Sequence, residues 1–212
     1  MCARYAVYGS PKDMVKVFDL IEPQDVDPNY NVCPTDTAPV VIKTDDGNAL
    51  KSFKFGLLPK WAERKDPRLG ARFINARSET VLTKPLYKKA VRSRRCLVIA
   101  NGWYEWIGPK GDKQPWHMHR GGDLIAFAGL YDNGTFSVLT VAANPDTADI
   151  HARMPLLLDQ PLRWLEDLDD EGIEEMMQAP EAGSVFLHKV GRAVNNVRSK
   201  GAELIVPLAS GH

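Results

Sequence analysis

The stretch Cys96-Leu97-Val98-Ile99-Ala100-Asn101-Gly102-Trp103-Tyr104-Glu105-Trp106-Ile107 contains two apolar, strand-like runs joined by Asn101-Gly102. Short runs of aliphatic and aromatic residues that are bounded by turn residues are typical of β-strands. We therefore expect residues 96–100 and 103–107 to pair as a hairpin within a sheet. The rest of the chain adds further strands on both sides of this hairpin.

Strand-like runs outnumber helix-like runs along the chain. Strands are expected at residues 4–8, 40–43, 50–55, 114–119, 123–131, 135–143 and 185–190. Asp132-Asn133-Gly134 is a strong hairpin signal between two of these runs. The pattern predicts a single α+β domain over residues 1–212, with its core at about 2–208, built mainly on an antiparallel, barrel-like sheet with flanking short helices.

The expected helices are few and short. Ser10-Pro11 combines a capping residue with a proline at the first helical position. We expect the apolar stripe that follows, made of Met14, Val17, Phe18 and Ile21, to face the core. A short helix with a basic outer face is expected within residues 84–95, and two short helices within 162–177.

Composition limits the classes of protein that fit. The 212 residues carry 27 Lys and Arg against 27 Asp and Glu, so any contact with nucleic acid requires a local basic patch. The three cysteines include no CxxC pair, which argues against a disulfide framework or a ribbon-type zinc site and fits a reducing cytoplasm. With no signal region and no apolar run of about 18 residues, we expect a cytoplasmic protein without a membrane span, a metal or a cofactor.

Cys2 is the residue with the most distinctive potential chemistry. Methionine aminopeptidases remove Met1 when the next residue is small, and removal would leave Cys2 with a free α-amine beside its thiol. Both groups have reference pKa values near neutrality, about 7.7–8.0 and about 8.5. Such a 1,2-aminothiol condenses with an aldehyde to an imine, which the thiol then closes to a five-membered thiazolidine. Position alone is equally consistent with a small residue that starts a strand.

Four other positions could support such chemistry or bind DNA. Asn75 and Arg77 leave a strand on one face, although a turn asparagine and a surface arginine would look the same. Glu105 lies between Tyr104 and Trp106, and if these rings bury it, its pKa would rise toward the range useful for proton transfer. His151 lies near a basic residue in a loop that ends in proline, and could transfer protons or simply be solvated.

Trp61 is a large aromatic residue in a loop bounded by glycine and proline. An exposed tryptophan can stack on an unpaired base, which is worth about 1–3 kcal/mol. A tryptophan that packs over the edge of a sheet is equally ordinary.

Several motifs occur in a fixed order over nearly the whole chain. They are Met1-Cys2-Ala3-Arg4-Tyr5, Tyr30-Asn31-Val32-Cys33-Pro34-Thr35, Gly56-Leu57-Leu58-Pro59-Lys60-Trp61-Ala62, Asn75-Ala76-Arg77-Ser78-Glu79-Thr80, Arg95-Cys96-Leu97-Val98, Gly102-Trp103-Tyr104-Glu105-Trp106, Ala143-Asn144, His151-Ala152-Arg153-Met154-Pro155 and Val194-Asn195-Asn196. Each motif alone is weak, but the ordered set is specific. Through them the chain resembles the SOS-response-associated peptidase (SRAP) family of abasic-site processing proteins.

The resemblance implies the SRAP fold and a DNA-repair enzyme that crosslinks itself to abasic sites in single-stranded DNA. It implies a thiazolidine formed by mature Cys2, which shields the lesion from strand breakage, with weak lyase and autopeptidase activity as side reactions. Nothing in the sequence suggests an obligate assembly, so we expect a monomer without a metal, which associates with the nucleoid when bound to DNA. The implied catalytic residues are Cys2, Asn75, Glu105 and His151, and the implied DNA-binding residues are Arg4, Trp61, Arg77 and Arg153.

The chain departs from the family pattern at three positions. Ala3 stands where the family usually has Gly, Cys33 where it has Ala, and Phe55 where it has Trp. Ala3 could disturb the geometry of the nucleophile if that site needs a positive φ. Two other hypotheses remain open: a cysteine or N-terminal-nucleophile peptidase that uses Cys2, and a noncatalytic module that binds single-stranded nucleic acid.

Overall fold

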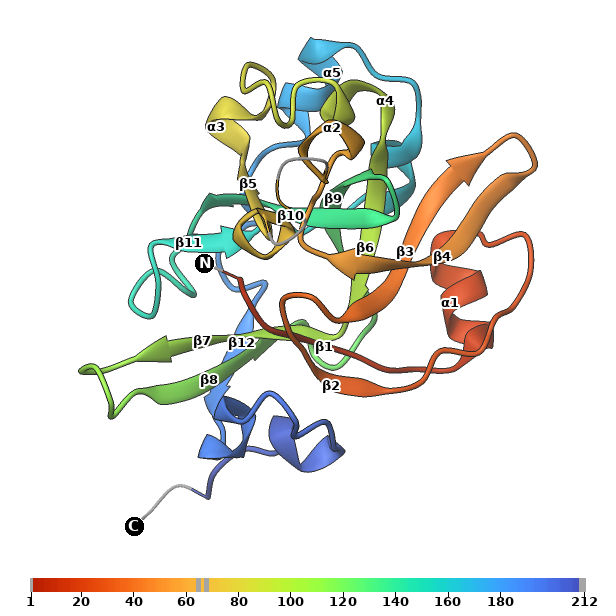
Figure 1. The fold of residues 1–212 in the computed structure, drawn as a ribbon. Helices are drawn as coiled ribbons and strands as arrows, with labels where there is room; N and C mark the ends of the chain where they lie inside the picture. Colours follow the sequence, from red (N-terminus) through yellow and green to blue (C-terminus); the bar gives the residue numbers. More distant parts are fainter. Residues whose placement is uncertain (1, 64–65, 67–68, 210–212) are drawn as a thin grey trace.

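The strands of the protein form two sheets, shown in Figure 1. This computed structural model describes residues 2–63, 66 and 69–209. The smaller sheet has five strands in the order β12-β8-β7-β1-β2, and every neighbouring pair is antiparallel. Its strands are β1 Tyr5–Val7, β2 Asn29–Val32, β7 Gly102–Ile107, β8 Gln114–His119 and β12 Phe186–Lys189.

The larger sheet has seven strands and closes on itself. Its strands are β3 Thr37–Thr44, β4 Gly47–Phe55, β5 Asn75–Arg77, β6 Arg95–Ala100, β9 Ile125–Asp132, β10 Thr135–Ala142 and β11 Arg153–Pro155. The order β10-β4-β3-β6-β9 becomes a ring because β9 also pairs with β10. The pairs that β10 makes with β4 and β5 are parallel, and the others are antiparallel. The predicted α+β fold on a mainly antiparallel, barrel-like sheet is confirmed.

The hairpin expected from residues 96–107 is wrong, because β6 and β7 belong to different sheets. Strand β6 pairs with β3 and β9, whereas β7 pairs with β1 and β8. The chain crosses between the sheets at Asn101, whose backbone N–H donates to the Ala6 carbonyl at 2.8 Å. The Asn101 side-chain oxygen accepts the Tyr8 N–H, also at 2.8 Å. Strand β1 therefore occupies the place beside β7 that the prediction gave to β6.

The helices are short. The α-helices are α1 Pro11–Phe18, α2 Lys60–Glu63, α3 Ser78–Val81, α4 Ala90–Ser93 and α5 Asp170–Glu175, and the 3₁₀ helices are η1 Leu69–Arg72, η2 Pro161–Leu165, η3 Arg192–Asn195 and η4 Ala202–Ile205. The basic helix expected over 84–95 is reduced to α4 at its C-terminal end. None of the helices in the described part of the chain combines the length and the apolar character needed to cross a membrane.

Helix α1 forms as predicted but is shorter than its apolar pattern suggests. The Ser10 side chain caps it by accepting the Asp13 N–H at 3.2 Å. The helix ends where Asp19 adopts a left-handed conformation, with φ of 50°. Only half of the predicted stripe is therefore buried: Met14 and Phe18 are in the core, while Val17 and Ile21 are 37% and 51% exposed.

One hydrophobic core joins the two sheets. Tyr5 of β1 packs edge-on against Phe55 and Phe127 of the barrel, with ring centroids 5.7 and 5.9 Å apart. Trp103 of β7 packs in the same way on Phe127 at 6.0 Å. Aromatic pairs in this geometry each add about 0.5–1.5 kcal/mol beyond the area that they bury. The sheets are thus fixed relative to one another, in agreement with the predicted single domain.

Candidate active site

The beginning of the chain runs between the two sheets. Strand β1 pairs with β7, and the Arg4 carbonyl accepts the Tyr104 N–H at 3.0 Å, which places the residues before β1 along β7. From the opposite side, the Asn75 amide donates to the Cys2 carbonyl at 3.0 Å. Figure 1 shows this arrangement, with the N-terminal end of the chain between β7 and the β5–β10–β11 part of the larger sheet.

Asn75 is held firmly enough to orient the Cys2 backbone. It is the first residue of β5 and stands beside Val138 in the parallel pairing of β5 with β10. The Asn75 carbonyl also accepts the Tyr87 hydroxyl at 3.1 Å. Both contacts restrict the strand, so the amide of Asn75 presents a fixed donor to Cys2.

A pocket of about 470 Å³ opens beside this point. Its lining consists of Ala3, Arg4, Glu105, Trp106, Lys113, His151 and Asn195. Glu105 is only 5% exposed, so the burial expected from its aromatic neighbours is confirmed. The pocket brings Glu105 of β7 together with His151, which lies just before β11 of the larger sheet. Three residues predicted from the sequence thus share one cavity.

The Cys2 thiol is fully buried in this arrangement. Burial, and secondly the negative charge of Glu105, raise the pKa of the Cys2 thiol well above its usual range. The thiol is therefore protonated at neutral pH, and its Sγ lies 3.9 Å from the Arg4 carbonyl. Met1, whose removal would free the Cys2 amine, lies outside the described residues. Ala3 is not among the described non-glycine residues with positive φ, so its methyl group causes no backbone strain.

The His151 ring has a defined orientation. Its Nδ1 atom accepts the backbone N–H of Arg153 at 2.9 Å. A neutral imidazole that accepts through Nδ1 carries its proton on Nε2. Nδ1 also lies 3.1 Å from the Arg153 carbonyl oxygen, so contacts with the Arg153 backbone fix the ring in either neutral tautomer.

The Arg4 side chain is held in place by uncharged neighbours. Its Nη1 atom donates to the Asn31 side chain at 3.0 Å and to the Val194 carbonyl at 2.8 Å. The guanidinium also lies over the Trp106 ring, 5.7 Å from its centroid. All of these partners are neutral, and Arg4 lines the same pocket as the Glu105 carboxylate.

Arg77 and Arg153 differ sharply in their surroundings. Arg77 is exposed at the end of β5. Arg153 is paired through both terminal nitrogens with the Glu79 carboxylate, and it also donates to the backbone of Thr140. The hydrogen bond from Arg153 lowers the pKa of Glu79. Of these two predicted phosphate ligands, only Arg77 is placed on the surface without a carboxylate partner among the described residues.

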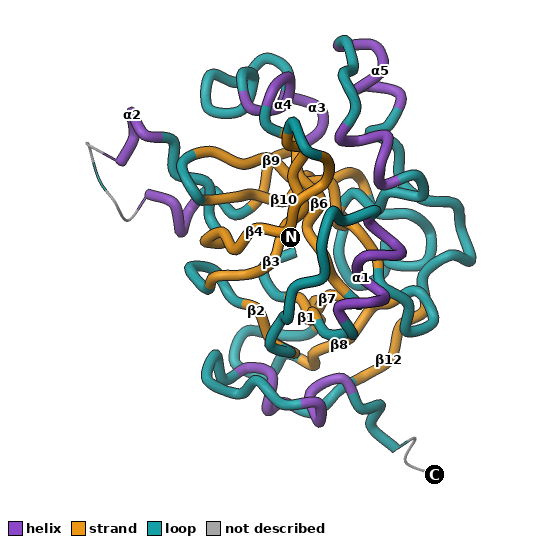
Figure 2. Tube along the Cα trace, turned by 90° about the vertical axis from the view of Figure 1, so that its right-hand side faces the viewer, coloured by secondary structure: helices purple, strands orange, loops and turns teal. Residues whose placement is uncertain are grey.

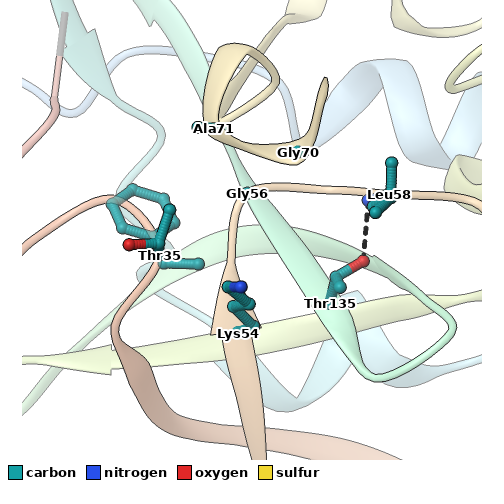
Figure 3. A pocket seen from close by; sticks show the side chains of 8 residues that line it. Thr35, Lys54, Gly56, Leu58, Gly70, Ala71 and Thr135 are labelled. Carbon is teal, nitrogen blue, oxygen red and sulfur yellow. Dashed lines mark hydrogen bonds between the residues drawn. The ribbon is translucent and has the colours of Figure 1, made fainter. Parts of the chain in front are cut away.

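Trp61 lies away from the pocket, on a loop whose two ends meet at Gly56 and Gly70. We call this meeting point the neck of the loop. Gly56 has a φ of 127°, and a Cβ atom there would come within 2.4 Å of the Gly70 carbonyl oxygen. Beside the neck, the Leu58 N–H donates to the Thr135 hydroxyl at 2.8 Å, as Figure 3 shows. The loop that this neck carries projects from the body of strands with α2 on it, as seen in Figure 2. Trp61 in α2 is 56% exposed.

The neck also borders a second pocket, of about 280 Å³. Figure 3 shows its lining, which consists of Thr35, Lys54, Phe55, Gly56, Leu58, Gly70, Ala71 and Thr135. None of the predicted catalytic residues lines it. The predicted residues Arg4, Glu105 and His151 line the first pocket instead.

Sequence reasoning assigned no role to three residues of the candidate site. Trp106 donates from its indole nitrogen to the Asn195 side chain at 2.6 Å, which closes one wall of the pocket. Asn195 belongs to the quoted Val194-Asn195-Asn196 motif, so the sequence contained a signal for it. Lys113 is exposed in the loop between β7 and β8, and no sequence motif marks it.

The chain is similar to several known proteins. A family model described as "SOS response associated peptidase (SRAP)" matches residues 1–197. The chain is 31% identical to "Abasic site processing protein YoqW" of Bacillus subtilis, over 97% of this chain and 99% of the relative. It is also 31% identical to "Abasic site processing protein YedK" of Escherichia coli, over 98% and 100% of the two chains. A crystal structure from Bacteroides thetaiotaomicron shares the fold, with a TM-score of 0.80, 21% identity and coverage of 98% and 100%.

Proposed function

The chain belongs to the SOS response associated peptidase (SRAP) family, and from this premise we propose that it captures abasic sites in single-stranded DNA through mature Cys2. Relatives that are named abasic site processing proteins support a role in processing this lesion. The proposed product is a thiazolidine between Cys2 and the C1 carbon of the abasic sugar. A noncatalytic binding module would not need the acid–base groups that surround Cys2.

The observation that carries the proposal is that Cys2 contacts Asn75 and interacts with Glu105, which lines one pocket together with His151. Asn75 binds the Cys2 carbonyl, and Glu105 acts electrostatically on the Cys2 thiol. Glu105 and His151 line the same cavity. A nucleophile with an acid and a base in reach is the arrangement that aldehyde capture requires.

The first step is opening of the sugar. An abasic sugar is mostly a closed hemiacetal, and its aldehyde appears only when the ring C–O bond breaks. His151 donates a proton to the ring oxygen as this bond breaks, and the C1 hydroxyl proton passes to water as the aldehyde forms. The contacts of Nδ1 with the Arg153 backbone hold the ring in place for this step.

The second step forms two bonds and releases one water. The Cys2 amine, freed by removal of Met1, adds to C1 to give a carbinolamine. Glu105 takes a proton from the amine and returns one to the C1 hydroxyl, which leaves as water and gives the imine. The thiol sulfur then adds to C1 while its proton passes to the nitrogen, with Glu105 as the carrier. Asn75 holds the Cys2 carbonyl, which keeps the sulfur close to C1.

The finished ring explains why the lesion would be protected. In the thiazolidine, C1 no longer exists as an aldehyde or imine, so the β-elimination that breaks the strand is suppressed. An imine that fails to close can still eliminate, which would give a weak lyase activity. Glu105 near Cys2 would also be placed to assist removal of Met1 or later release of the DNA. We rank these side activities, including peptidase activity, below crosslinking.

DNA would be held by charges around the pocket. Arg4 and Arg77 carry positive charge at its edge and at the end of β5, and suit the phosphates on either side of the lesion. Arg153 would bind phosphate only by exchanging Glu79 for it. Trp61 is exposed enough to stack on a base further along the strand. Since the chain has no net charge, we expect binding to depend on this local patch and to weaken as salt rises.

The test is a denaturing gel of mature protein mixed with single-stranded DNA that carries one abasic site. Wild type should give a heat-stable, shifted band, and Cys2→Ala should give none. Cys33→Ala is the matched control, because it removes another buried thiol and installs the residue that the family usually has. A band of equal strength with Cys2→Ala, or no band with mature wild type, would contradict the proposal.

A further inference from the structure

Three of the five histidines meet on the face of the five-stranded sheet opposite to Trp103 and Glu105. His117 and His119 are two residues apart on β8, so their side chains leave the same face of the sheet. His188 of β12 stands directly opposite His117 in the antiparallel pairing of β12 with β8. Strand pairing thus brings together residues that are far apart in the sequence.

The three rings form a compact triangle. Their centroids are 5.4 Å apart for His117 and His119, 5.3 Å for His117 and His188, and 5.2 Å for His119 and His188. One ring nitrogen from each histidine lies within 4.8 Å of the corresponding atoms of the other two. Ligands at about 2.0–2.1 Å in a tetrahedral zinc site lie about 3.4 Å apart, so small side-chain rotations would close the triangle.

His117 provides an independent indication of a ligand. It is only 2% exposed, and neither of its ring nitrogens has a hydrogen-bond partner among the described residues. A buried polar side chain without a partner is costly, and its presence calls for an explanation. The ring also occupies space that only a glycine leaves open, since a Cβ atom at Gly102 would lie 2.4 Å from the His117 Nε2.

His188 is oriented as metal-bound histidines usually are. Its Nε2 atom is 2.9 Å from the Ile205 carbonyl oxygen, so in the neutral ring the Nε2 proton is donated to that oxygen. This fixes the tautomer and leaves the lone pair on Nδ1. Histidine ligands typically donate their other ring N–H to a carbonyl or carboxylate in this way.

We propose that His117, His119 and His188 bind one divalent transition-metal ion, with Zn²⁺ as the best match. Imidazole nitrogen is a preferred ligand of zinc and its neighbours in the first transition series, whereas magnesium and calcium prefer oxygen. Three protein ligands leave a fourth position for water or an added ligand. The ion would tie β12, which lies at the edge of the sheet, to β8. The expectation of no metal came from composition, cysteine spacing and the family resemblance, none of which concerns these histidines.

The test is a zinc titration of the full-length chain, prepared without an added histidine tag and stripped with EDTA. Isothermal calorimetry should show one Zn²⁺ per chain, and Co²⁺ should give the absorption bands of a four-coordinate site that Zn²⁺ then abolishes. His119→Gln and His188→Gln each change a partly exposed ligand, and each should lower the affinity by about 100-fold or more. Zinc should also raise the melting temperature of the wild type but not of these two variants.

His151→Gln is the matched control, because it removes a histidine of the other pocket and should bind zinc like the wild type. Wild-type protein that binds less than one zinc per chain would overturn the proposal, whether or not the variants fold. Equal affinity in wild type, His119→Gln and His188→Gln would also overturn it. The three rings would then be an aromatic cluster packed on Tyr104, whose ring centroid is 5.1 Å from that of His117.

Discussion

The two faces of the five-stranded sheet carry different chemistry, although they share the same strands. On β7, Glu105 belongs to the face near Cys2, and its neighbour Tyr104 belongs to the face with the histidines. The first face turns toward the barrel and opens into the pocket. The second is covered by the C-terminal segment, where Val194 and Leu204 pack against Tyr104. We call these the Cys2 face and the histidine face.

The difference shows how one strand can serve two sites. Alternate residues of a strand point to opposite sides, so Glu105 and Tyr104 each reach only one face, whereas Trp106 packs with the C-terminal segment and also lines the pocket. The Cys2 face places polar groups where the two sheets meet, because Asn75 and His151 come from the larger sheet or its edge. The histidine face uses only strands of its own sheet. The two sites should therefore respond separately to mutation.

The largest effect after loss of Cys2 is expected from Glu105→Gln. This change keeps the shape of the side chain but removes the group that moves protons during imine formation and ring closure. We expect the crosslinking rate to fall about 100-fold or more, in the range typical of a lost general acid–base group. Single-turnover gel kinetics would measure it. Tyr104→Phe, on the histidine face of the same strand, should crosslink at the wild-type rate. An equal loss of crosslinking rate in this variant would contradict the separation of the two faces.

A smaller loss is expected from Asn75→Ala, which removes the hydrogen bond to the Cys2 carbonyl. Without it the Cys2 backbone is less well held, and we expect crosslinking to slow by about 10-fold. Stability should fall by about 1 kcal/mol, the usual net value of one hydrogen bond. Kinetics and urea unfolding would measure the two effects. A variant that loses stability without any change in crosslinking rate would show that Asn75 is only a structural residue.

The two arginines of the DNA path should differ in their dependence on salt. Arg77→Ala removes a phosphate contact, so the slope of log affinity against log salt should become shallower by about 0.7 for single-stranded DNA. Arg153→Ala should leave that slope nearly unchanged and lower stability, because Arg153 already pairs with Glu79. Fluorescence anisotropy with a labelled oligonucleotide at several salt concentrations would test this. The opposite pattern would place the DNA over Arg153.

The smallest effects concern the dependence of stability on pH. The Cys2 face should lose stability at alkaline pH, and the histidine face should lose it at acidic pH. Burial raises the pKa of Cys2 and Tyr5, so these groups stabilise the fold fully below pH 9, the unfolded value of the thiol, and less as pH rises above it. Burial first, and then His188 and His119, lower the pKa of His117 from 6.5 to about 3. The neutral ring therefore favours folding above pH 6.5, and this contribution is lost as pH falls toward 3.

Urea unfolding of the metal-free chain would test the prediction in both pH ranges. From pH 8 to 10, wild type should lose stability more steeply than Cys2→Ala, by about 1 kcal/mol for one buried thiol. From pH 7 to 5, where histidines titrate but few carboxylates do, stability should fall as pH falls. If stability does not change between pH 7 and 5, the histidine face can be protonated without destabilising the fold, which would contradict the prediction.

The sequence predicted much of the fold, and its main error has a clear physical cause. Two apolar runs separated by Asn101-Gly102 have the pattern of a hairpin, and local periodicity cannot tell which strand lies beside each run. Strand β1, which is distant in the sequence, pairs with β7 instead, because Asn101 forms hydrogen bonds with Ala6 and Tyr8. The hairpin at Asn133-Gly134 was predictable because its turn residues adopt positive φ angles of 49° and 68°, which their types favour.

The candidate site was predicted through its residues and not through its geometry. Cys2, Glu105 and His151 stood out by position and neighbours, and the family resemblance linked them. The pairing of Arg153 with Glu79 could not be foreseen, because it depends on β11 and α3 meeting in space. The histidine triangle was missed for the same reason, since His188 joins His117 only through the register of β12 on β8.

The measurement that tests the central claim most directly is the intact mass of the crosslinked product. Mature protein would be incubated with an abasic single-stranded oligonucleotide and analysed by mass spectrometry under denaturing conditions. We predict the summed mass of the chain without Met1 and the oligonucleotide, less one water, with fragmentation placing the link at Cys2. An adduct that retains Met1, or a link at any other residue, would contradict capture of the lesion by the Cys2 amine and thiol.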